Sequence, residues 1–279
     1  MFLVKKMVTA DFSFAVQLAN TMDWNMTLKD FEFMSSVEPF GCFVLFYDLE
    51  RVGIATCINY GHVGWFGNLV IKDNYRNIGA GSFILRHNIN YLKKKGVLTI
   101  GLYSYPNLTG FYAKHQFVID TEFLVLRGSP SISTTFIEKE YAKKENFLSL
   151  LKFDKRCVGF SREKTLLPLF SDKCNKVYFS AKNGNIKGYV LIKISNQTAE
   201  IGPLITLQNS KNIATDLLFT ALRKLNDFDV FIYVQKKNKE LIKLLLESGL
   251  QKESSVVRMF LGSSIDTDCL YFPESLERG

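Results

Sequence analysis

Residues 75–82 have the side chains and spacing to bind a phosphate-bearing ligand. They read Tyr-Arg-Asn-Ile-Gly-Ala-Gly-Ser and lie between an apolar run at 65–71 and a helix-like segment. The first N–H groups of a helix have no intrahelical partner, and the helix dipole adds partial positive charge there. Gly79 and Gly81 lack a Cβ, so an anion can approach the backbone, and the Arg76 guanidinium suits phosphate oxygens. The pattern therefore predicts a pyrophosphate site at a helix N-terminus.

Two common phosphate-binding signatures are absent from this stretch. No Gly-Lys-Ser/Thr closes it as in a P-loop, and the Gly-x-Gly-x-x-Gly of dinucleotide-binding folds is missing. Residues 76–81 instead resemble the Arg/Gln-x-x-Gly-x-Gly/Ala motif of the GNAT superfamily, whose members move an acyl group from coenzyme A to an amine. The context agrees: Trp24-Asn25 with Thr27 and Asp30 resembles the loop and second helix upstream of that motif.

The downstream context also resembles this superfamily. Phe111-Tyr112-Ala113-Lys114, followed by Phe117, is similar to the Phe/Leu-Tyr-x-Lys-x-Gly-Phe signature of its last helix. The resemblance implies that Tyr112 is the acid that protonates the departing sulfur, and the alternative is a tyrosine of the core. It further implies that backbone groups of Leu69 and Ile71 pair with the pantetheine arm of acetyl-CoA. The full set of implied coenzyme contacts is Leu69, Val70, Ile71, Arg76, Asn77, Ile78, Gly79, Ala80, Gly81, Ser82 and Asn107.

Several positions depart from the superfamily pattern or leave a role open. Tyr105 stands where many members have an asparagine, although Asn107 is close by, and Gln116 replaces a glycine. No general base stands out, because Glu32 and Glu38 are typical of solvated helix residues and His62 is typical of a surface loop; His87 and His115 are expected to be structural or exposed. Trp24 and Trp65 are candidates to line the acceptor site, with two core aromatics as the equal alternative.

The composition excludes some classes of protein and leaves others open. The 279 residues carry a net charge of +8, and no apolar run approaches the roughly 20 residues of a membrane span. The lysines are scattered, which argues against a nucleic-acid interface. Five cysteines without a C-x-x-C pair predict free thiols in a reducing compartment, no metal site and a cytoplasmic protein.

The order of strand-like and helix-like segments predicts a mixed α/β fold, and the second half repeats the plan of the first. Residues 128–133 are small, polar and interrupted by proline, so they read as a linker. Beyond them, residues 199–205 resemble residues 64–70, with Gly202 aligned to Gly67. The prediction is two tandem GNAT-like domains, 1–128 and 136–279, each a mostly antiparallel mixed sheet flanked by helices.

The second copy lacks the features that would carry chemistry. Residues 207–214 contain no arginine and no glycine where the first copy has its phosphate motif, and Leu245 stands in the place of Tyr112. We therefore expect a degenerate second domain. The predicted function is acetyl-CoA-dependent N-acetyl transfer by direct attack of an amine on the thioester. The alternatives are transfer of an aminoacyl or other acyl group, or a non-catalytic acyl-CoA-binding module. The acceptor amine and the oligomeric state stay open.

Overall fold

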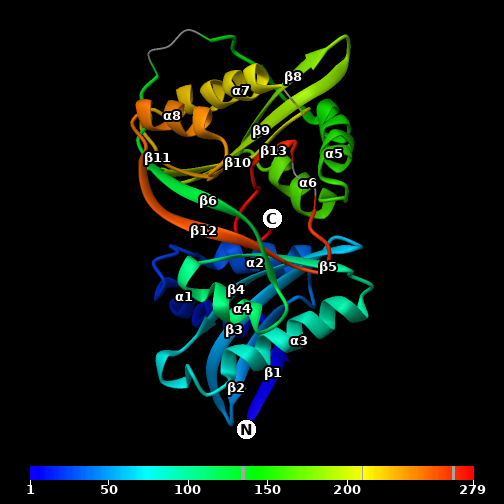
Figure 1. Cartoon of the computed structure of the whole chain (residues 1–279), viewed down its shortest axis with the longest axis vertical. Coiled ribbons are helices and arrows are strands. Elements are labelled where there is room, and N and C mark those ends of the chain that lie inside the picture. Colours follow the sequence, from blue (N-terminus) through cyan, green and yellow to red (C-terminus); the bar gives the residue numbers. More distant parts are fainter. Residues whose placement is uncertain (133–135, 209, 266–267) are drawn as a thin grey trace. The chain divides into compact units, whose positions relative to one another are not determined.

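The computed structural model describes residues 1–132, 136–208, 210–265 and 268–279, and it contains two compact units (Figure 1). Unit 1 comprises Met1–Leu102 with Leu261–Ser263 and Arg278, and unit 2 comprises Tyr103–Phe260, Ser264–Glu277 and Gly279. Ser133 at the end of the predicted linker and Asn209 in the second copy lie outside the described residues. The compact units thus divide the chain at another place than the sequence repeat does.

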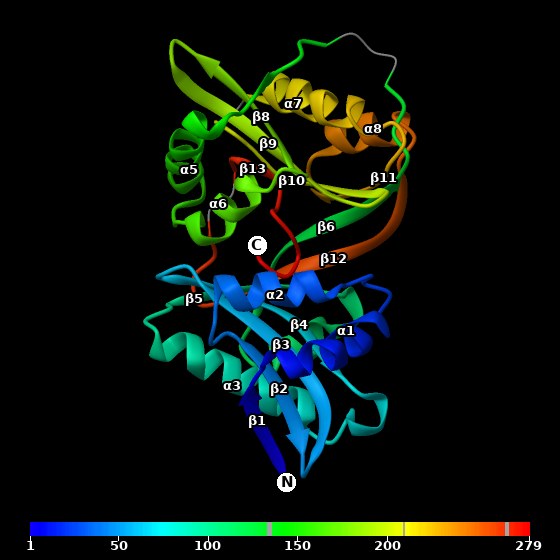
Figure 2. The same cartoon turned by 180° about the vertical axis from the view of Figure 1, so that it is seen from behind.

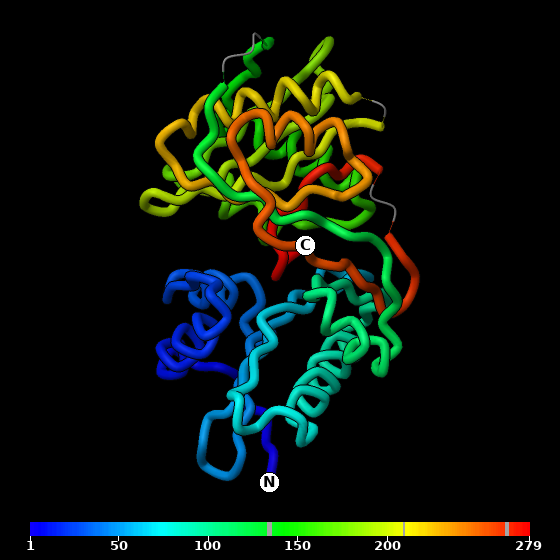
Figure 3. Tube along the Cα trace, turned by 60° about the vertical axis from the view of Figure 1, so that its left-hand side comes forward, coloured from blue at the N-terminus to red at the C-terminus, as the bar shows by residue number. Residues whose placement is uncertain are grey.

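Unit 1 contains a sheet covered on both faces by helices. Figure 3 shows α1 and α2 in blue on one side of its strands and α3 on the other. Neighbouring strands from β1 to β4 are antiparallel, and β4 pairs with β5 in parallel. Its elements are β1 (Phe2–Lys6), α1 (Phe12–Asn20), α2 (Leu28–Val37), β2 (Cys42–Tyr47), β3 (Glu50–Asn59), β4 (Val63–Ile71), α3 (Ala80–Lys94) and β5 (Thr99–Ser104), the last of which continues into unit 2.

Local signals in the sequence explain where the helices of unit 1 begin. Thr27 and Asp30 form a capping box at the start of α2, where the Thr27 N–H donates to the Asp30 carboxylate at 2.7 Å. The buried side chains of α3 are spaced as one helical face and include Ile84, Leu85 and Leu92. The two residues that resembled a family feature upstream of the phosphate motif therefore have a structural role.

In the strands of unit 2, β6 from the first half of the sequence lies between two strands from the second half. β6 pairs antiparallel with β11 on one edge and with β12 on the other, and the order continues through β10, β9, β8 and β7 (Figure 2). Its elements are α4 (Thr109–Ala113), β6 (Val118–Gly128), β7 (Glu140–Tyr141), α5 (Lys144–Val158), α6 (Glu163–Ser171), β8 (Lys176–Lys182), β9 (Asn185–Ser195), β10 (Thr198–Thr206), α7 (Lys211–Arg223), β11 (Asp229–Gln235), α8 (Lys239–Glu247), β12 (Gln251–Leu261) and β13 (Leu270–Phe272).

The predicted repeat is visible in the backbone pattern of the strands of both units. β4 pairs with β5 in parallel only over 63–65, and β10 pairs with β11 in parallel only over 198–201. Just after the end of β4, the Lys72 N–H donates to the carbonyl of Val52 in β3. Just after the end of β10, the Leu207 N–H donates in the same way to the carbonyl of Lys187 in β9. The predicted mixed fold, mostly antiparallel and flanked by helices, is confirmed.

Candidate active site

The phosphate motif forms the N-terminus of α3, and the N-cap residue makes no side-chain cap hydrogen bond. Gly79 is the N-cap residue with φ of +90°, a left-handed conformation that favours glycine. Apart from its chain neighbours, a Cβ built on Gly79 would meet no described atom within 4 Å, so there is open space beside this residue. The 15-residue helix thus presents the N–H groups of its first turn and its positive dipole end toward a region that an anion can enter.

Arg76 is anchored next to this helix terminus by contacts within unit 1. Its Nε donates to the carbonyl of Ile71 at 3.0 Å, which ties the guanidinium to the end of β4. Its Nη2 forms an ion pair with Asp73 at 2.9 Å, and the Arg76 side chain is 45% exposed. Exposed pairs of this kind contribute at most about 1 kcal/mol, so the guanidinium can exchange Asp73 for a phosphate oxygen at small cost.

The remaining predicted coenzyme contacts of unit 1 lie between the end of β4 and the first turn of α3. Val70, Ile71 and Ala80 are buried, whereas Ile78 is exposed and Asn77 has a positive φ of 62° in the loop. After β4 the chain passes through a short 3-10 helix, Asp73–Tyr75, into this loop. The end of the strand, Arg76 and the start of α3 are therefore separated by about a dozen residues at most. Leu69, Gly81 and Ser82 are partly exposed members of the same segment.

A bulge in β4, which the sequence pattern did not predict, precedes these residues. Asn68 is buried with φ of +52°, and its Nδ2 donates to the Thr56 hydroxyl at 3.1 Å. The register between β3 and β4 shifts between Ile54 and Thr56, opposite this residue. A bulge redirects the backbone groups next to it. The signal in the sequence was the Gly67-Asn68 pair in the middle of an otherwise apolar strand.

The open edge of β4 lies beyond its short parallel pairing with β5. Successive N–H groups of a strand point to opposite edges. The Lys72 N–H donates to Val52 in β3, so the N–H of Ile71 faces away from β3. Among the described residues the pairing with β5 ends at Trp65. Residues 69–71 therefore offer backbone groups on the side where β4 and β5 diverge.

Tyr112 and Asn107 belong to unit 2. Tyr112 is 7% exposed on α4, where its ring lies edge-on to those of Phe111 and Phe117 with centroids 5.0 and 6.0 Å apart. Burial raises the pKa of Tyr112 above the ordinary value of 10.0, so the phenol keeps its proton at neutral pH. Asn107 is exposed in the short 3-10 helix Pro106–Leu108 that precedes α4. The structure thus groups these two residues in unit 2 and the other predicted coenzyme contacts in unit 1.

The two candidate acceptor-site tryptophans differ in exposure. Trp24 is partly exposed in the loop between α1 and α2, between two residues in the left-handed conformation, Asp23 and Asn25. Trp65 is buried in β4 at the last position that pairs with β5. Trp24 therefore has surface to offer a ligand in this conformation, while Trp65 supports the strand from which the open edge begins.

The prediction that Glu38 is a solvated helix residue is wrong. Glu38 is 9% exposed at the end of α2, where its carboxylate accepts the Asn59 N–H at 3.1 Å and the Tyr91 hydroxyl at 2.6 Å. A carboxylate taken out of water needs such donors. Burial and the Glu38 charge together raise the pKa of the Tyr91 phenol. Glu38 thus joins α2, β3 and α3, and its hydrogen bonds fit a structural role.

Glu32 and the three histidines have the surroundings that were predicted for them, either exposed or packed in a structural role. Glu32 and His62 are exposed, as expected. His87 packs edge-on against Phe43 at 4.7 Å between ring centroids, and burial lowers its pKa. His115 is partly exposed and lies edge-on to Phe111.

Comparisons with known proteins agree with this architecture. Residues 10–117 match the model of the acetyltransferase (GNAT) family, and residues 150–270 match that of an acetyltransferase (GNAT) domain. No curated protein matches the chain. The chain belongs to the GNAT superfamily and carries two GNAT domains in tandem.

Solved structures show the same fold over the whole chain. A putative acetyltransferase from Pyrococcus horikoshii is 22% identical, with 100% of this chain and 96% of that chain covered and a TM-score of 0.82. A GCN5-related N-acetyltransferase from Sphaerobacter thermophilus is 13% identical, with 96% and 98% covered and a TM-score of 0.66. A tandem GNAT protein from the clavulanic acid biosynthesis pathway is 12% identical, with 95% and 100% covered and a TM-score of 0.62. No helix among the described residues is long and apolar enough to cross a membrane.

Proposed function

We propose that the protein is an acetyl-CoA-dependent N-acetyltransferase of the cytoplasm that acetylates an amine by direct attack on the thioester. The observation that carries this proposal is the N-terminus of α3, which begins at a glycine N-cap with open space beside it and has Arg76 tied to the end of β4 nearby. These groups fit a pyrophosphate, because amides, helix dipole and guanidinium all favour negative charge there. The domain with these groups is residues 1–128, and residues 136–279 form the degenerate copy.

The residues of this chain divide the work as follows. Backbone groups of Leu69 and Ile71 bind the pantetheine arm as a neighbouring strand would, and a backbone N–H at the Asn68 bulge holds the thioester oxygen as negative charge develops. Coenzyme A supplies the activated acyl group. Tyr112 donates its proton to the departing sulfur, and its phenol is in the protonated form at neutral pH.

A matched pair of glycine variants tests the site. Gly79 and Gly61 have nearly the same conformation, with φ of +90° and +94°, and a Cβ on either would meet nothing within 4 Å. Gly79→Val and Gly61→Val should therefore lose similar stability. Only Gly79→Val should lose acetyl-CoA binding, by at least about tenfold in Kd measured by calorimetry, because its side chain fills the anion site. Equal affinity in the two variants would refute the site.

The nature of the reaction is tested separately by turnover. Release of free coenzyme A thiol in the presence of an amine library identifies an N-acetyltransferase. Binding of acetyl-CoA without thiol release from any amine would favour the alternative of a non-catalytic acyl-CoA-binding module. Release only with a longer or aminoacyl donor would favour a different acyl transfer.

A further inference from the structure

In unit 2 a segment of the chain itself pairs with β10 on the edge that faces away from β9. We define this β13 segment as residues 269–274; it contains β13, which Figure 2 shows in red beside β10. Leu204 of β10 lies opposite Phe272 and Ile205 opposite Leu270, in antiparallel register. The Thr206 N–H donates to the carbonyl of Cys269 at 3.0 Å. The parallel pairing of β10 with β11 ends at Ile201, and the pairing with the β13 segment begins after it, at Leu204.

This edge of β10 corresponds, residue for residue, to the open edge of β4. The alignment that places Gly202 on Gly67 also places Thr206 on Ile71. The hydrogen bonds agree with it, because the next residues, Lys72 and Leu207, both donate to the neighbouring antiparallel strand. In unit 1 the N–H of Ile71 faces the side proposed for the pantetheine arm. In unit 2 the equivalent N–H of Thr206 is bonded to a backbone carbonyl.

The fit between β10 and the β13 segment depends on a glycine. A Cβ added to Gly202 would lie 2.1 Å from the Pro273 carbonyl oxygen, which no side chain can tolerate. Phe272 is fully buried in the core of unit 2 with Ile201 and Leu204, and Leu270 is buried as well. The glycine that resembles Gly67 in the sequence thus makes room for the chain instead of a ligand.

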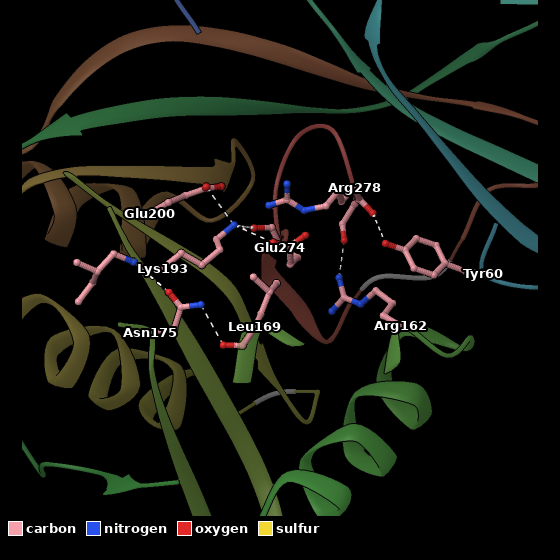
Figure 4. A network of polar contacts seen from close by, with 10 residues as sticks. Tyr60, Arg162, Leu169, Asn175, Lys193, Glu200, Glu274 and Arg278 are labelled. Carbon is pink, nitrogen blue, oxygen red and sulfur yellow. Dashed lines mark hydrogen bonds and ion pairs between the residues drawn. The ribbon is translucent and has the colours of Figure 1, made fainter. Parts of the chain in front are cut away.

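Charged contacts hold the end of the same segment. Figure 4 shows Lys193 of β9 reaching Glu274, whose carboxylate is 2.9 Å away and whose carbonyl accepts a second hydrogen bond. The Lys193 ammonium also pairs with Glu200 of β10 at 3.0 Å. Glu274 is 1% exposed, and a buried carboxylate that loses its partner is strongly destabilised. Lys193 therefore favours the seated position of the segment.

We propose that the β13 segment is an internal occupant of the groove in unit 2 that is equivalent to the acyl-CoA groove of unit 1. Unit 2 is closed to acyl-CoA by its own chain, in addition to lacking the arginine and glycines at 207–214. The protein then has one acyl-CoA site per chain. This inference rests on the proposed function for the identity of the ligand in unit 1. The pairing of β10 with the β13 segment does not depend on that function.

Hydrogen exchange at two equivalent amides tests the proposal on the full chain. The Thr206 amide should exchange slowly in the free protein and stay unchanged when acetyl-CoA is added. The Ile71 amide should slow by at least about tenfold on addition of acetyl-CoA, because only this edge is open. Slowing of Thr206 by acetyl-CoA, or fast exchange of Thr206 in the free protein, would overturn the proposal. Slow Thr206 exchange without any acetyl-CoA effect at Ile71 would count against the proposed function alone.

Displacement of the segment gives a second test. Gly202→Ala should push Pro273 away, so Thr206 exchange should accelerate and the partly buried Cys269 thiol should react faster with a maleimide. Gly184→Ala, in the turn between β8 and β9, is the control because its Cβ would meet nothing within 4 Å. Acetyl-CoA affinity should stay within about twofold in both variants. Unchanged Thr206 exchange and Cys269 reactivity in Gly202→Ala would show that the segment is not seated on Gly202.

Discussion

At the scale of single residues, Arg76 already holds an anion in the place where a phosphate is proposed. The Asp73 carboxylate is ion-paired with Nη2 of Arg76, and the two side chains are 84% and 45% exposed. A bound pyrophosphate has to displace this carboxylate and also experiences its repulsion. Asp73 therefore works against the ligand, while the bond from Nε to the Ile71 carbonyl keeps the guanidinium in place.

Asp73→Asn should therefore strengthen acetyl-CoA binding. We expect Kd to fall by about two- to fivefold at low salt, and the gain to shrink as salt screens the charges. Calorimetric titrations at two ionic strengths measure both effects. Glu122→Gln, which removes a carboxylate from an exposed ion pair with Lys236 in unit 2, serves as the control and should change nothing. A weaker affinity in Asp73→Asn would mean that Asp73 positions Arg76 for the ligand.

Tyr112→Phe should lower the rate of acetyl transfer and leave acetyl-CoA affinity unchanged. The phenylalanine keeps the packing against Phe111 and Phe117 and removes only the proton. General acid catalysis is worth about a hundredfold or more, so kcat should fall by that factor in a thiol-release assay. Tyr141→Phe, at an exposed tyrosine of β7, is the control. A kcat within about twofold of the wild-type value would show that Tyr112 is a core tyrosine and not the acid.

The residues found from the sequence are those that belong to a local motif. Arg76 and Gly79 could be predicted because their motif occurs between upstream and downstream residues that resemble the same superfamily, and Gly79 is the N-cap residue of α3. Glu38 could not, since a glutamate near a helix end is usually solvated. Its burial arises from Asn59 and Tyr91, which come from elements far away in the sequence.

At the scale of elements, Gln116 shows how the two copies differ in a turn. Gln116 follows α4 with φ of +68°, a left-handed conformation, at the position where the superfamily pattern has glycine. In the second copy Gly249 follows α8 with φ of +98°. A residue with a Cβ pays about 1–2 kcal/mol for this conformation, and glycine loses about 0.5–1 kcal/mol in conformational entropy. The first copy therefore carries a small, local strain.

Gln116→Gly should raise the free energy of unfolding by up to about 1 kcal/mol, because the gain in the turn exceeds the entropy that glycine loses. Urea denaturation followed by circular dichroism measures the change. The converse substitution, Gly249→Ala, should destabilise the protein, since its Cβ would also lie 3.1 Å from the Ser129 carbonyl oxygen. A lower stability of Gln116→Gly would indicate that the glutamine side chain contributes more than the turn conformation costs.

The elements themselves were predictable to different degrees. The apolar run at 65–71 lies within β4, and Thr27 and Asp30 mark the start of α2, because both elements have clear boundaries in capping and turn residues. β13 was not predicted, since three residues carry too little periodicity to indicate a strand. Its existence depends on the shape of β10 at Gly202, which is a property of the folded sheet.

At the scale of the whole chain, the sequence repeat and the compact units differ because of β6. This strand belongs to the first half of the sequence, yet its full length pairs with β11 and β12 in unit 2. Val125 lies opposite Tyr233 on one side and Ser254 on the other. A sequence repeat gives no information about which distant strands pair. The sequence therefore predicted two similar halves, but not that β6 of the first half pairs with strands of the second half.

A fragment of residues 136–279 should therefore fail to fold on its own. Without β6, the facing edges of β11 and β12 have no partner, and buried β6 residues such as Phe123 and Leu126 leave the core. We expect no cooperative unfolding transition and strong binding of a hydrophobic dye. A fragment extended to residues 103–279 restores α4 and β6 and should recover a cooperative transition. Cooperative unfolding of the shorter fragment would show that the second copy folds without the strand of the first.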